Sequence, residues 1–265
     1  MSDTNKYNLP ESFAEDFEHF YIPKHLKNIG VMADVHIPYQ SNRGIEEAID
    51  YFLVKNIDCL FINGDALDCY MLSSFQPDPR KRHFAEEVLS IQHFFRSMKE
   101  AFPGARVYYK KGNHEFRYER IMMNRCPEFL SIPAFEFSNV LGLKDLGIEV
   151  IDDKRIVYAG NLPIFHGHEL NLKSVSVNPA RSLFLKTHAS AMCSHLHRTS
   201  QHTEPSINED IVCWSTGHLG EEHPAYAPIN KWNLGCARIE KDEEGNFEVI
   251  NFGLKKNKLF SMAVV

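Results

Sequence analysis

The sequence lacks an apolar run of the length that a membrane-spanning helix requires, and its first twenty residues are acidic and polar. A signal peptide would be basic and then apolar, so we expect a soluble, cytoplasmic protein with no membrane partner. The six cysteines are scattered without a CxxC pair, which is typical of buried thiols in a reducing compartment. Disulfides and metal sites built on thiolates are therefore not expected.

An excess of positive charge is also absent, since the net charge is -6 at pH 7 and the isoelectric point is near 6.2. The whole molecule would not attract nucleic acid, so a polyanion would have to meet a local basic patch. There is no internal repeat and no low-complexity tract. A chain of 265 residues suits one sizeable core, and we expect a leader over residues 1–28 followed by a single domain over 29–265. The sequence leaves the oligomeric state open.

The first half of the chain alternates apolar runs with amphipathic segments. Residues 28–33, 57–62 and 105–109 are apolar runs that each stop at a polar loop, which indicates buried strands. Residues 43–55 and 84–101 carry apolar side chains at helical spacing. This order predicts crossover connections in a sheet with parallel pairs, and the three polar loops should meet at one edge of that sheet.

The second half is richer in short strands. We expect strands at residues 148–151, 155–159, 163–165, 190–193, 211–215, 235–240 and 247–252, with helices near 138–143 and 179–187. A second sheet packed against the first would accommodate them. The predicted fold class is therefore α/β, with two packed mixed β-sheets flanked by helices.

Histidine is unusually frequent, with 14 residues, and several stand beside acids, Asn or Gly. Five motifs each follow an expected strand: Asp34-Val35-His36, Gly64-Asp65, Gly112-Asn113-His114-Glu115, His166-Gly167-His168 and His195-Leu196-His197. One such pair alone is more often loop or core packing than a metal site, but packing does not explain the ordered set.

A pair of metal ions would explain the set, because two cations about 3.5–4 Å apart need a bridging carboxylate among imidazole, amide and carboxylate ligands. Asp65 is the natural bridge. Asp34, His36 and one of the histidines 195 and 197 would complete one ion, and Asn113, His166 and the other histidine would complete the second.

The ordered motifs resemble the calcineurin-like metallophosphoesterases, whose pattern is D-x-H, G-D-x-x-D, G-N-H-E/D, an isolated H and G-H-x-H. The resemblance covers roughly residues 29–197, and residues 214–228 are more loosely similar to stand-alone members encoded by phages and prophages. It implies a first ion on Asp34, His36, Asp65 and His197 and a second on Asp65, Asn113, His166 and His195. It also implies His114 as the general acid and Asp68 as the carboxylate that orients it. The implied cofactors are two divalent ions, with Mn as first choice and Fe, Zn or Mg as alternatives.

The sequence departs from that pattern at Ser194, where the family usually has Gly, and the turn could change there without loss of a ligand. His168 could replace His166 if its loop is shifted by two residues. The segment 217–220 looks similar to the last motif but lacks a second histidine, so we expect a loop at the rim of the site.

The mechanistic hypothesis is a hydroxide that bridges the two ions and attacks phosphorus in line, while His114 protonates the leaving group. Basic residues near these motifs could hold phosphoryl oxygens or a polyanion, or could be solvated loop charge: Arg117 above all, then Arg120, Lys110, Lys111 and the run 80–83. Aromatic residues could stack on a base or pack in the core: Tyr39, Phe75, Phe116, Tyr118 and Tyr226.

The expected substrate is a phosphate ester, and we expect a phosphodiester, with nucleic acid as one such partner. A phosphomonoesterase, including a protein phosphatase, is the alternative enzyme. A metal-binding scaffold without turnover is a third reading. It is disfavoured because a scaffold has no need of both His114 and Asp68.

Overall fold

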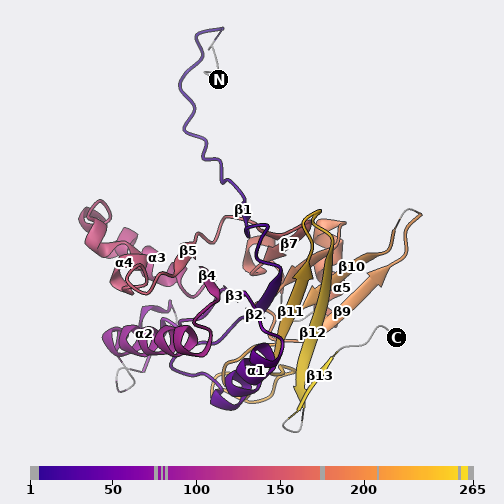
Figure 1. The fold of residues 1–265 in the computed structure, drawn as a ribbon. Helices are drawn as coiled ribbons and strands as arrows, with labels where there is room; N and C mark the ends of the chain where they lie inside the picture. Colours follow the sequence, from indigo (N-terminus) through magenta and orange to yellow (C-terminus); the bar gives the residue numbers. More distant parts are fainter. Residues whose placement is uncertain are drawn as a thin grey trace.

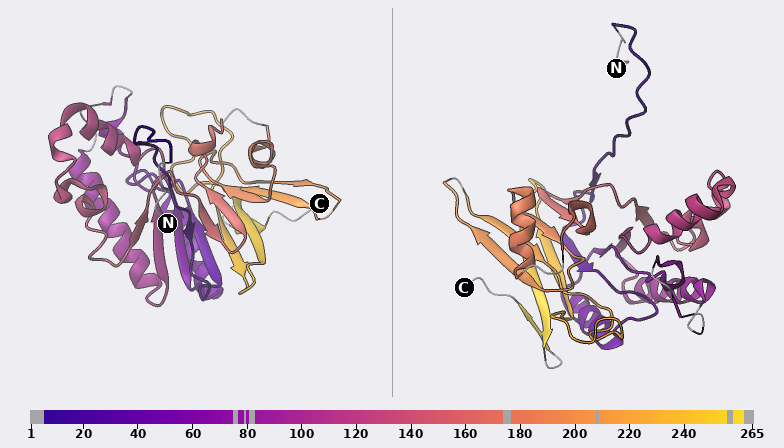
Figure 2. Two further views of the ribbon diagram at one scale, coloured as in Figure 1. Left: turned by 90° about the horizontal axis from the view of Figure 1, so that it is seen from above. Right: turned by 180° about the vertical axis from the view of Figure 1, so that it is seen from behind.

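The computed structural model describes residues 6–74, 77–78, 80, 83–173, 177–207, 209–255 and 258–261 (Figures 1 and 2). Phe75, Lys81 and Arg82, which were considered above, lie outside the described residues. Within the described residues the strands form one sheet of seven strands and one of six. None of the helices in the described part of the chain combines the length and the apolar character that crossing a bilayer needs.

The seven-stranded sheet has the order β13-β12-β11-β2-β3-β4-β5. Its parallel strands are β2 (Asn28–Met32), β3 (Cys59–Asn63), β4 (Arg106–Lys110) and β5 (Glu149–Ile151). Its antiparallel strands are β11 (Gly235–Lys241), β12 (Phe247–Lys255) and β13 (Lys258–Ser261). The parallel part contains the three strands that the sequence predicts to end in polar loops.

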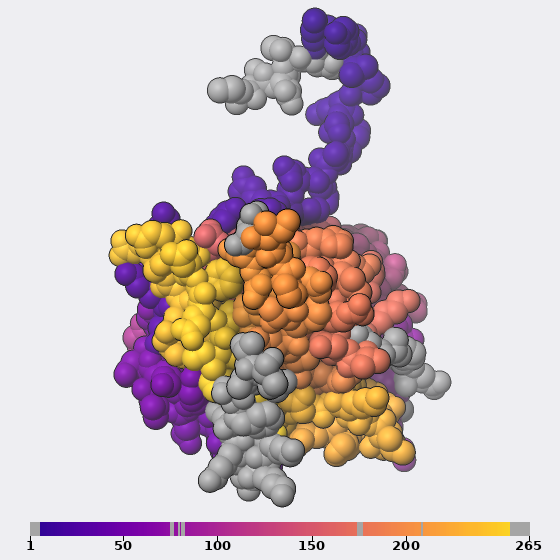
Figure 3. Space-filling model, turned by 90° about the vertical axis from the view of Figure 1, so that its right-hand side faces the viewer, coloured from indigo at the N-terminus to yellow at the C-terminus, as the bar shows by residue number. Residues whose placement is uncertain are grey.

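The six-stranded sheet has the order β1-β6-β7-β8-β10-β9 and is also mixed. Its strands are β1 (Phe20–Tyr21), β6 (Val157–Ala159), β7 (Leu162–Phe165), β8 (Ala191–Cys193), β9 (Ser200–Glu204) and β10 (Ile211–Ser215). Residues 6–19 are exposed and project from the body (Figures 1 and 3), whereas β1 joins this sheet. The division into a leader and a domain stays a prediction.

The two sheets pack face to face because the side chains of β2 and β3 alternate between two cores. Ile29, Val31 and Phe61 contact apolar residues of the six-stranded sheet such as Ile164. On the opposite face, Met32 and its neighbours pack against helices α1 (Asn42–Val54), α2 (Phe84–Ala101), α3 (Phe116–Arg125) and α4 (Phe137–Val140). Helix α5 (Pro179–Thr187) covers the outer face of the six-stranded sheet. The predicted α/β class with two packed mixed sheets is confirmed.

Several elements differ from the sequence-based expectation. The sequence predicts no element directly after Glu115, whereas the structure has helix α3 there, with only Tyr118 and Met122 buried. Only these two positions, four residues apart, face the core, and so narrow a stripe does not stand out in the sequence. Strand β9 is all polar and half-buried, so its side chains do not predict a strand. Its pairing with β10 over five residues stabilises the extended conformation. Short 3₁₀ helices occur at Tyr70–Leu72, Pro127–Phe129, Pro133–Phe135 and His168–Leu170.

Helix α2 anchors the loop that follows β3 through Glu87. This side chain is fully buried, and its carboxylate accepts the backbone N–H of Tyr70 at 3.1 Å. Burial raises the pKa of Glu87 to about 7, and the nearby Asp68 carboxylate acts in the same direction. The loop that carries Asp65 and Asp68 is therefore held by a carboxyl group that titrates near neutrality.

The Glu87→Gln variant should abolish one pH dependence of stability. In the wild type, the unfolded chain ionises at the ordinary pKa of 4.5 while the folded carboxyl keeps its proton to about pH 7, so the free energy of unfolding falls across this interval. Relative to wild type, the variant should gain roughly 3 kcal/mol between pH 4.5 and 8. Urea unfolding across that range measures the difference, and Glu86→Gln on the exposed face of the same helix is the control. Parallel pH profiles for wild type and Glu87→Gln would contradict the prediction.

Candidate metal centre

The chemistry-bearing residues gather where strands of both sheets end. Asp34 and His36 follow β2, Asp65 and Asp68 follow β3, and Asn113 and His114 follow β4. From the second sheet, His166 follows β7, and histidines 195 and 197 follow β8. Five of these residues adopt left-handed backbone conformations with φ between 49° and 68°: Asp34, His36, Asp65, His195 and His197. Such conformations are uncommon outside glycine and concentrate at functional sites.

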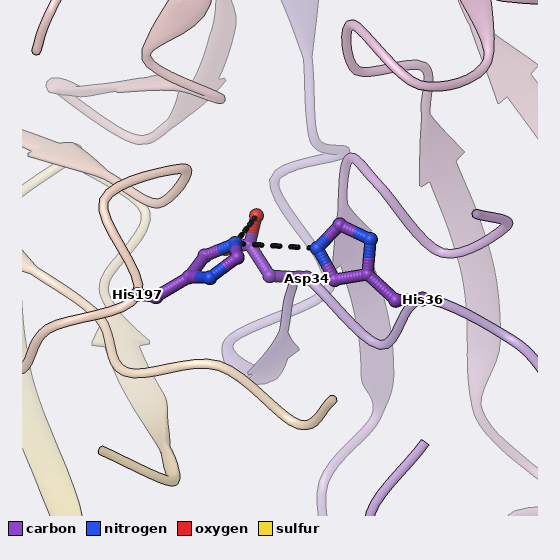
Figure 4. Close-up of side chains that lie close together, drawn as sticks. All are labelled: Asp34, His36 and His197. Atoms are coloured by element: carbon purple, nitrogen blue, oxygen red, sulfur yellow. Dashed lines mark hydrogen bonds and ion pairs between the residues drawn. The ribbon is translucent and has the colours of Figure 1, made fainter. Parts of the chain in front are cut away.

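Asp34, His36 and His197 form the first group of candidate ligands, and their polar atoms face one another (Figure 4). Nε2 of His197 lies 3.2 Å from Nε2 of His36 and 3.3 Å from Oδ1 of Asp34. Nδ1 of His36 donates to the Asp68 carboxylate at 3.0 Å. In the neutral ring, Nε2 of His36 therefore carries no proton and has a free lone pair. Oδ1 of Asp34 is buried without a hydrogen-bond donor among the described residues.

The Nε2 atoms of His36 and His197 face each other, so at most one of them can carry a proton, and the group has more acceptors than donors. A divalent cation would satisfy all three side chains at once, because carboxylate and imidazole are the donors that Mn, Fe and Zn accept. The residues present thus fit a bound metal ion.

The second group contains Asp65, His166 and His195, with Asn113 beside it. Nε2 of His166 lies 3.2 Å from Oδ2 of Asp65 and 3.3 Å from Oδ1 of Asn113. Nδ1 of His166 donates to the backbone carbonyl of Asn63 at 2.8 Å. In the neutral ring, Nε2 therefore has a free lone pair, which faces the oxygens of Asp65 and Asn113. Asp65 also groups with His36 and His114, which places it between the two sets of ligands.

The electrostatics of these residues agree with a site built for positive charge. Burial alone would raise the pKa of Asp34, but His197 and then His166 lower it to about 2. Burial likewise opposes ionisation of Asp65, whose pKa is nevertheless held well below its usual range by His114 and His166. Against the opposing effect of burial, Asp65 raises the pKa of His166 to about 10. Buried carboxylates thus stay ionised, and without a metal an imidazolium has to balance them.

Asp68, His114 and Arg117 form a connected set beside the two groups. Nδ1 of His114 lies 3.2 Å from Oδ1 of Asp68 and 2.9 Å from its backbone oxygen. Arg117 donates to Nε2 of His114 at 3.0 Å and to the backbone oxygen of Asp68 at 2.9 Å. Since arginine can only donate, Nε2 of His114 accepts here and Nδ1 carries the proton. Asp68 therefore orients both His114 and His36, and the second contact was not anticipated.

Glu115 joins the loop after β3 to the loop after β4 through hydrogen bonds. It lies in one of the five motifs, but no role for it was predicted from the sequence. Its buried carboxylate accepts the backbone N–H groups of Asp65, Leu67 and Gly112 at 3.1, 3.0 and 2.7 Å. It also accepts the hydroxyl of Tyr109 at 2.6 Å. Charged hydrogen bonds of this kind fix the loop that carries Asp65 against the loop that carries Asn113.

Two glycines allow the loops to approach so closely. A Cβ atom on Gly112 would lie 2.3 Å from Oδ1 of Asp65, and one on Gly64 would lie 2.2 Å from Nδ1 of His166. Gly64 also has a φ of 84°, which side chains disfavour. The glycines of both motifs are thus required by proximity to candidate ligands.

The structure corrects the expectation for two lysines. Lys110 is fully buried, and its Nζ lies 3.1 Å from Glu169, whose carboxylate also accepts the backbone N–H of His166. Lys111 pairs with Asp152 at 2.8 Å and with Glu119. Both ammonium groups are therefore engaged in holding loops together and do not face the candidate ligands. The sequence does not show this, because Glu169 and Asp152 lie tens of residues away along the chain.

The other basic and aromatic candidates separate into two kinds. Arg120 lies on α3 and donates to the backbone oxygen of Leu72, and Tyr118 packs in the core against Phe84 and Phe137. Phe116 is half-buried at the first position of α3.

Tyr39 and Tyr226, by contrast, line a cleft of about 480 Å³ that reaches His36, Asp68 and His197. Two further aromatic side chains, Tyr70 and Trp232, also line it, and they were not singled out from the sequence.

Contacts bear on three points that the sequence left open. His168 lies beside Asp153 and Glu169 at 3.5 Å and belongs to neither ligand group among the described residues, so His166 occupies the predicted position. Ser194 accepts a hydrogen bond from Asn63 at 2.8 Å, which holds the turn.

His218 is buried and stacked on His197, with ring centroids 4.8 Å apart, so this loop lies directly beside the first ligand group. The backbone N–H of its neighbour Leu219 donates to the backbone oxygen of Asp34 at 3.1 Å.

Comparison with known proteins identifies the family. The sequence model of the calcineurin-like phosphoesterases matches residues 27–223. The chain therefore belongs to this family and is a metal-dependent hydrolase of phosphate esters. No significant match is found among curated proteins.

Solved structures to which the chain is similar include vacuolar protein sorting 29 from Cryptosporidium parvum, a dimetal phosphatase from Danio rerio and the phosphoesterase Yfce from E. coli. Their sequence identities are 13%, 12% and 13%, and their TM-scores are 0.48, 0.45 and 0.40. The alignments cover 89% of this chain in each case and 95%, 98% and 97% of the other chains. At TM-scores below 0.5 these likenesses carry no argument about substrate.

Proposed function

We propose that this chain binds two divalent cations, Mn²⁺ by preference, and hydrolyses a phosphodiester. The observation that carries the proposal is the convergence of acceptor atoms into neighbouring groups linked by Asp65 and His36. Asp34, His36, Asp65 and His197 would hold the first ion. Asp65, Asn113, His166 and His195 would hold the second.

When bound, the cations would neutralise charge on the phosphoryl oxygens and lower the pKa of a water molecule that attacks phosphorus. The chain keeps its lone pairs directed at the ions, because His36 and His166 each donate Nδ1–H to an oxygen on the far side of the ring. Asp65 lies between the groups and would bridge them.

His114 would deliver the proton that the leaving oxygen needs. Asp68 fixes the ring through Nδ1, which leaves Nε2 as the atom that carries the proton to the leaving group. Arg117 now donates to that Nε2, so the arginine has to release it before the nitrogen can be protonated. The freed guanidinium would then meet a non-bridging phosphoryl oxygen.

Elemental analysis combined with a two-substrate assay tests the proposal. Purified protein should contain close to two metal ions per chain and should hydrolyse bis-p-nitrophenyl phosphate faster than p-nitrophenyl phosphate, with activity lost to a chelator and restored by Mn²⁺. The reverse substrate preference would favour the phosphomonoesterase alternative, including a protein phosphatase. Bound metal without hydrolysis of any ester would favour the scaffold.

Nucleic acid as the diester and the cytoplasm as the location stay predictions from the sequence. Lys110 and Lys111 pair with carboxylates of the chain. Two of the cations that were expected to contact a polyanion are therefore already neutralised. Of the basic candidates that the structure describes, Arg117 is the one that contacts Asp68 and His114 directly.

Gly112→Ala should disrupt the centre, while Gly104→Ala should not. An added methyl at position 112 meets Asp65 at 2.3 Å, so the bridging carboxylate has to move, whereas position 104 has no atom within 4 Å. We expect a loss of activity of about 100-fold or more at position 112, since a displacement of about 1 Å can have that effect. Hydrolysis of bis-p-nitrophenyl phosphate with metal analysis measures it. Equal activity in the two variants would show that the close approach is not needed.

A further inference from the structure

The cleft beside His36 and His197 has the features of a site for one particular kind of organic group. Its volume of about 480 Å³ falls in the range of about 300–1,000 Å³ typical of small-ligand pockets. Four aromatic side chains line it: Tyr39, Tyr70, Tyr226 and Trp232. They come from three separate loops, so this aromatic surface exists only in the folded chain.

The aromatic rings are held in place. Tyr39 packs edge to face on Tyr70 with centroids 6.0 Å apart. Trp232 packs on His197 at 4.4 Å, and Tyr226 lies 6.1 Å from Trp232.

The loop that carries Trp232 and Tyr226 is pinned by Asn230. The amide of Asn230 donates to the backbone oxygens of Glu222 and Ala227 at 2.7 and 2.8 Å, and its oxygen accepts the N–H of Trp232 at 2.8 Å. Preformed aromatic walls of this kind favour a planar partner.

The charge of the cleft restricts that partner further. Asp68 and Glu221 contribute carboxylates, and none of the described side chains that line the cleft is a lysine or an arginine. Beyond the phosphate itself, a second anionic group would meet repulsion here.

His218 supplies a polar atom for the ligand. It lines the cleft, is 1% exposed, and its Nε2 has no hydrogen-bond partner among the described residues. A buried polar atom without a partner in the folded chain is costly and indicates that something else meets it.

Resting on the proposed function, we infer that the organic group of the phosphate ester is a single planar, uncharged aromatic group, of the size of a nucleobase or an aryl ring, seated between these side chains. The phosphate would lie at the His36 and His197 end, and His218 would hydrogen-bond a polar atom of the ligand. The substrate is thereby a small aromatic ester, because the phosphates of an extended nucleic acid strand would be repelled by the carboxylate of Glu221.

Isothermal titration of the Mn²⁺-loaded full-length protein with two phosphonates tests this inference. Benzylphosphonate and cyclohexylmethylphosphonate share charge and approximate size and differ in planarity and aromaticity. Benzylphosphonate should bind about 2- to 12-fold more tightly, the ratio that corresponds to the energy of aromatic pairs beyond their buried area. Tyr226→Leu should reduce this ratio and Trp232→Leu should bring it near one. Tyr21→Leu, at another exposed tyrosine on β1, should leave it unchanged.

A charged probe provides the second arm. 4-Carboxybenzylphosphonate should bind more weakly than benzylphosphonate, and Glu221→Gln should narrow the gap while its neighbour Glu222→Gln does not. Equal affinity for the two uncharged-ring phosphonates in the wild type would overturn the inference while metal-dependent hydrolysis stands. Tighter, salt-sensitive binding of an eight-residue oligothymidylate would overturn it in favour of a nucleic acid strand. No binding of either phosphonate together with no hydrolysis of any ester would overturn the proposed function as well.

Discussion

Asp65→Asn should reduce hydrolysis of bis-p-nitrophenyl phosphate by roughly 10³-fold or more, because the paired ions supply several kcal/mol of charge stabilisation that a neutral amide cannot hold in place. Within the described part of the chain, Asp65 is the one carboxylate that groups with His36 on one side and with His166 and His195 on the other. Its ionised form is favoured by His114 and His166 despite burial, so the substitution removes a charge that the site maintains. Metal content, measured on the same sample, should fall below two ions per chain.

Asp58→Asn is the matched control for this experiment. Asp58 precedes the same strand, β3, at its opposite end, and its carboxylate accepts the N–H groups of Lys27 and Asn28 at 2.7 and 3.1 Å. An asparagine keeps an acceptor for one of these two N–H groups, and the position lies at the end of β3 opposite to the candidate ligands. We expect nearly wild-type activity and metal content. Full activity in Asp65→Asn would remove the basis for a bridged pair of ions.

His114→Ala should retain both ions and lose activity by about 10²- to 10⁴-fold, the usual contribution of a general acid. The ring is oriented by Asp68 and contacts Arg117, and neither contact is needed to bind metal. The loss should grow as the leaving group becomes more basic, because a poor leaving group depends more on protonation. A series of aryl phosphodiesters with increasingly basic phenols measures this dependence.

His93→Ala, at an exposed position of α2, controls for the loss of a histidine elsewhere. A constant loss across the leaving-group series in His114→Ala would mean that His114 positions the substrate or the water and does not donate the proton. Loss of metal in that variant would make His114 a ligand, which its grouping with His36 and Asp65 also allows. The two readouts therefore separate three roles for one residue.

The local pattern of the sequence determined much of the fold. Helices α2 and α5 have the predicted bounds, because their apolar spacing and flanking residues act within a few turns of chain. Strands β2, β3 and β4 were predicted within about two residues, since buried parallel strands are uninterrupted apolar runs. Helix α3 and strand β9 were missed because tertiary contacts hold polar segments whose own pattern is weak.

The sequence also determined which residues could bind metal, because the motifs follow strand ends and strand ends of a parallel sheet converge. Only the tertiary structure decided how the residues around them are used. Glu115 was part of a motif, yet two of the three backbone N–H groups that it accepts, those of Asp65 and Leu67, belong to a loop about fifty residues away. From the sequence, Lys110 and Lys111 were possible phosphate-binding residues, but in the folded chain they pair with the carboxylates of Glu169 and Asp152.

The aromatic cleft shows the same limit, since Tyr39, Tyr70 and Trp232 meet through loops of both sheets. The sequence predicts the role of a residue when its partners are close along the chain or when the strand order of the sheet brings them together. Contacts chosen by packing across long separations are specified only by the folded chain.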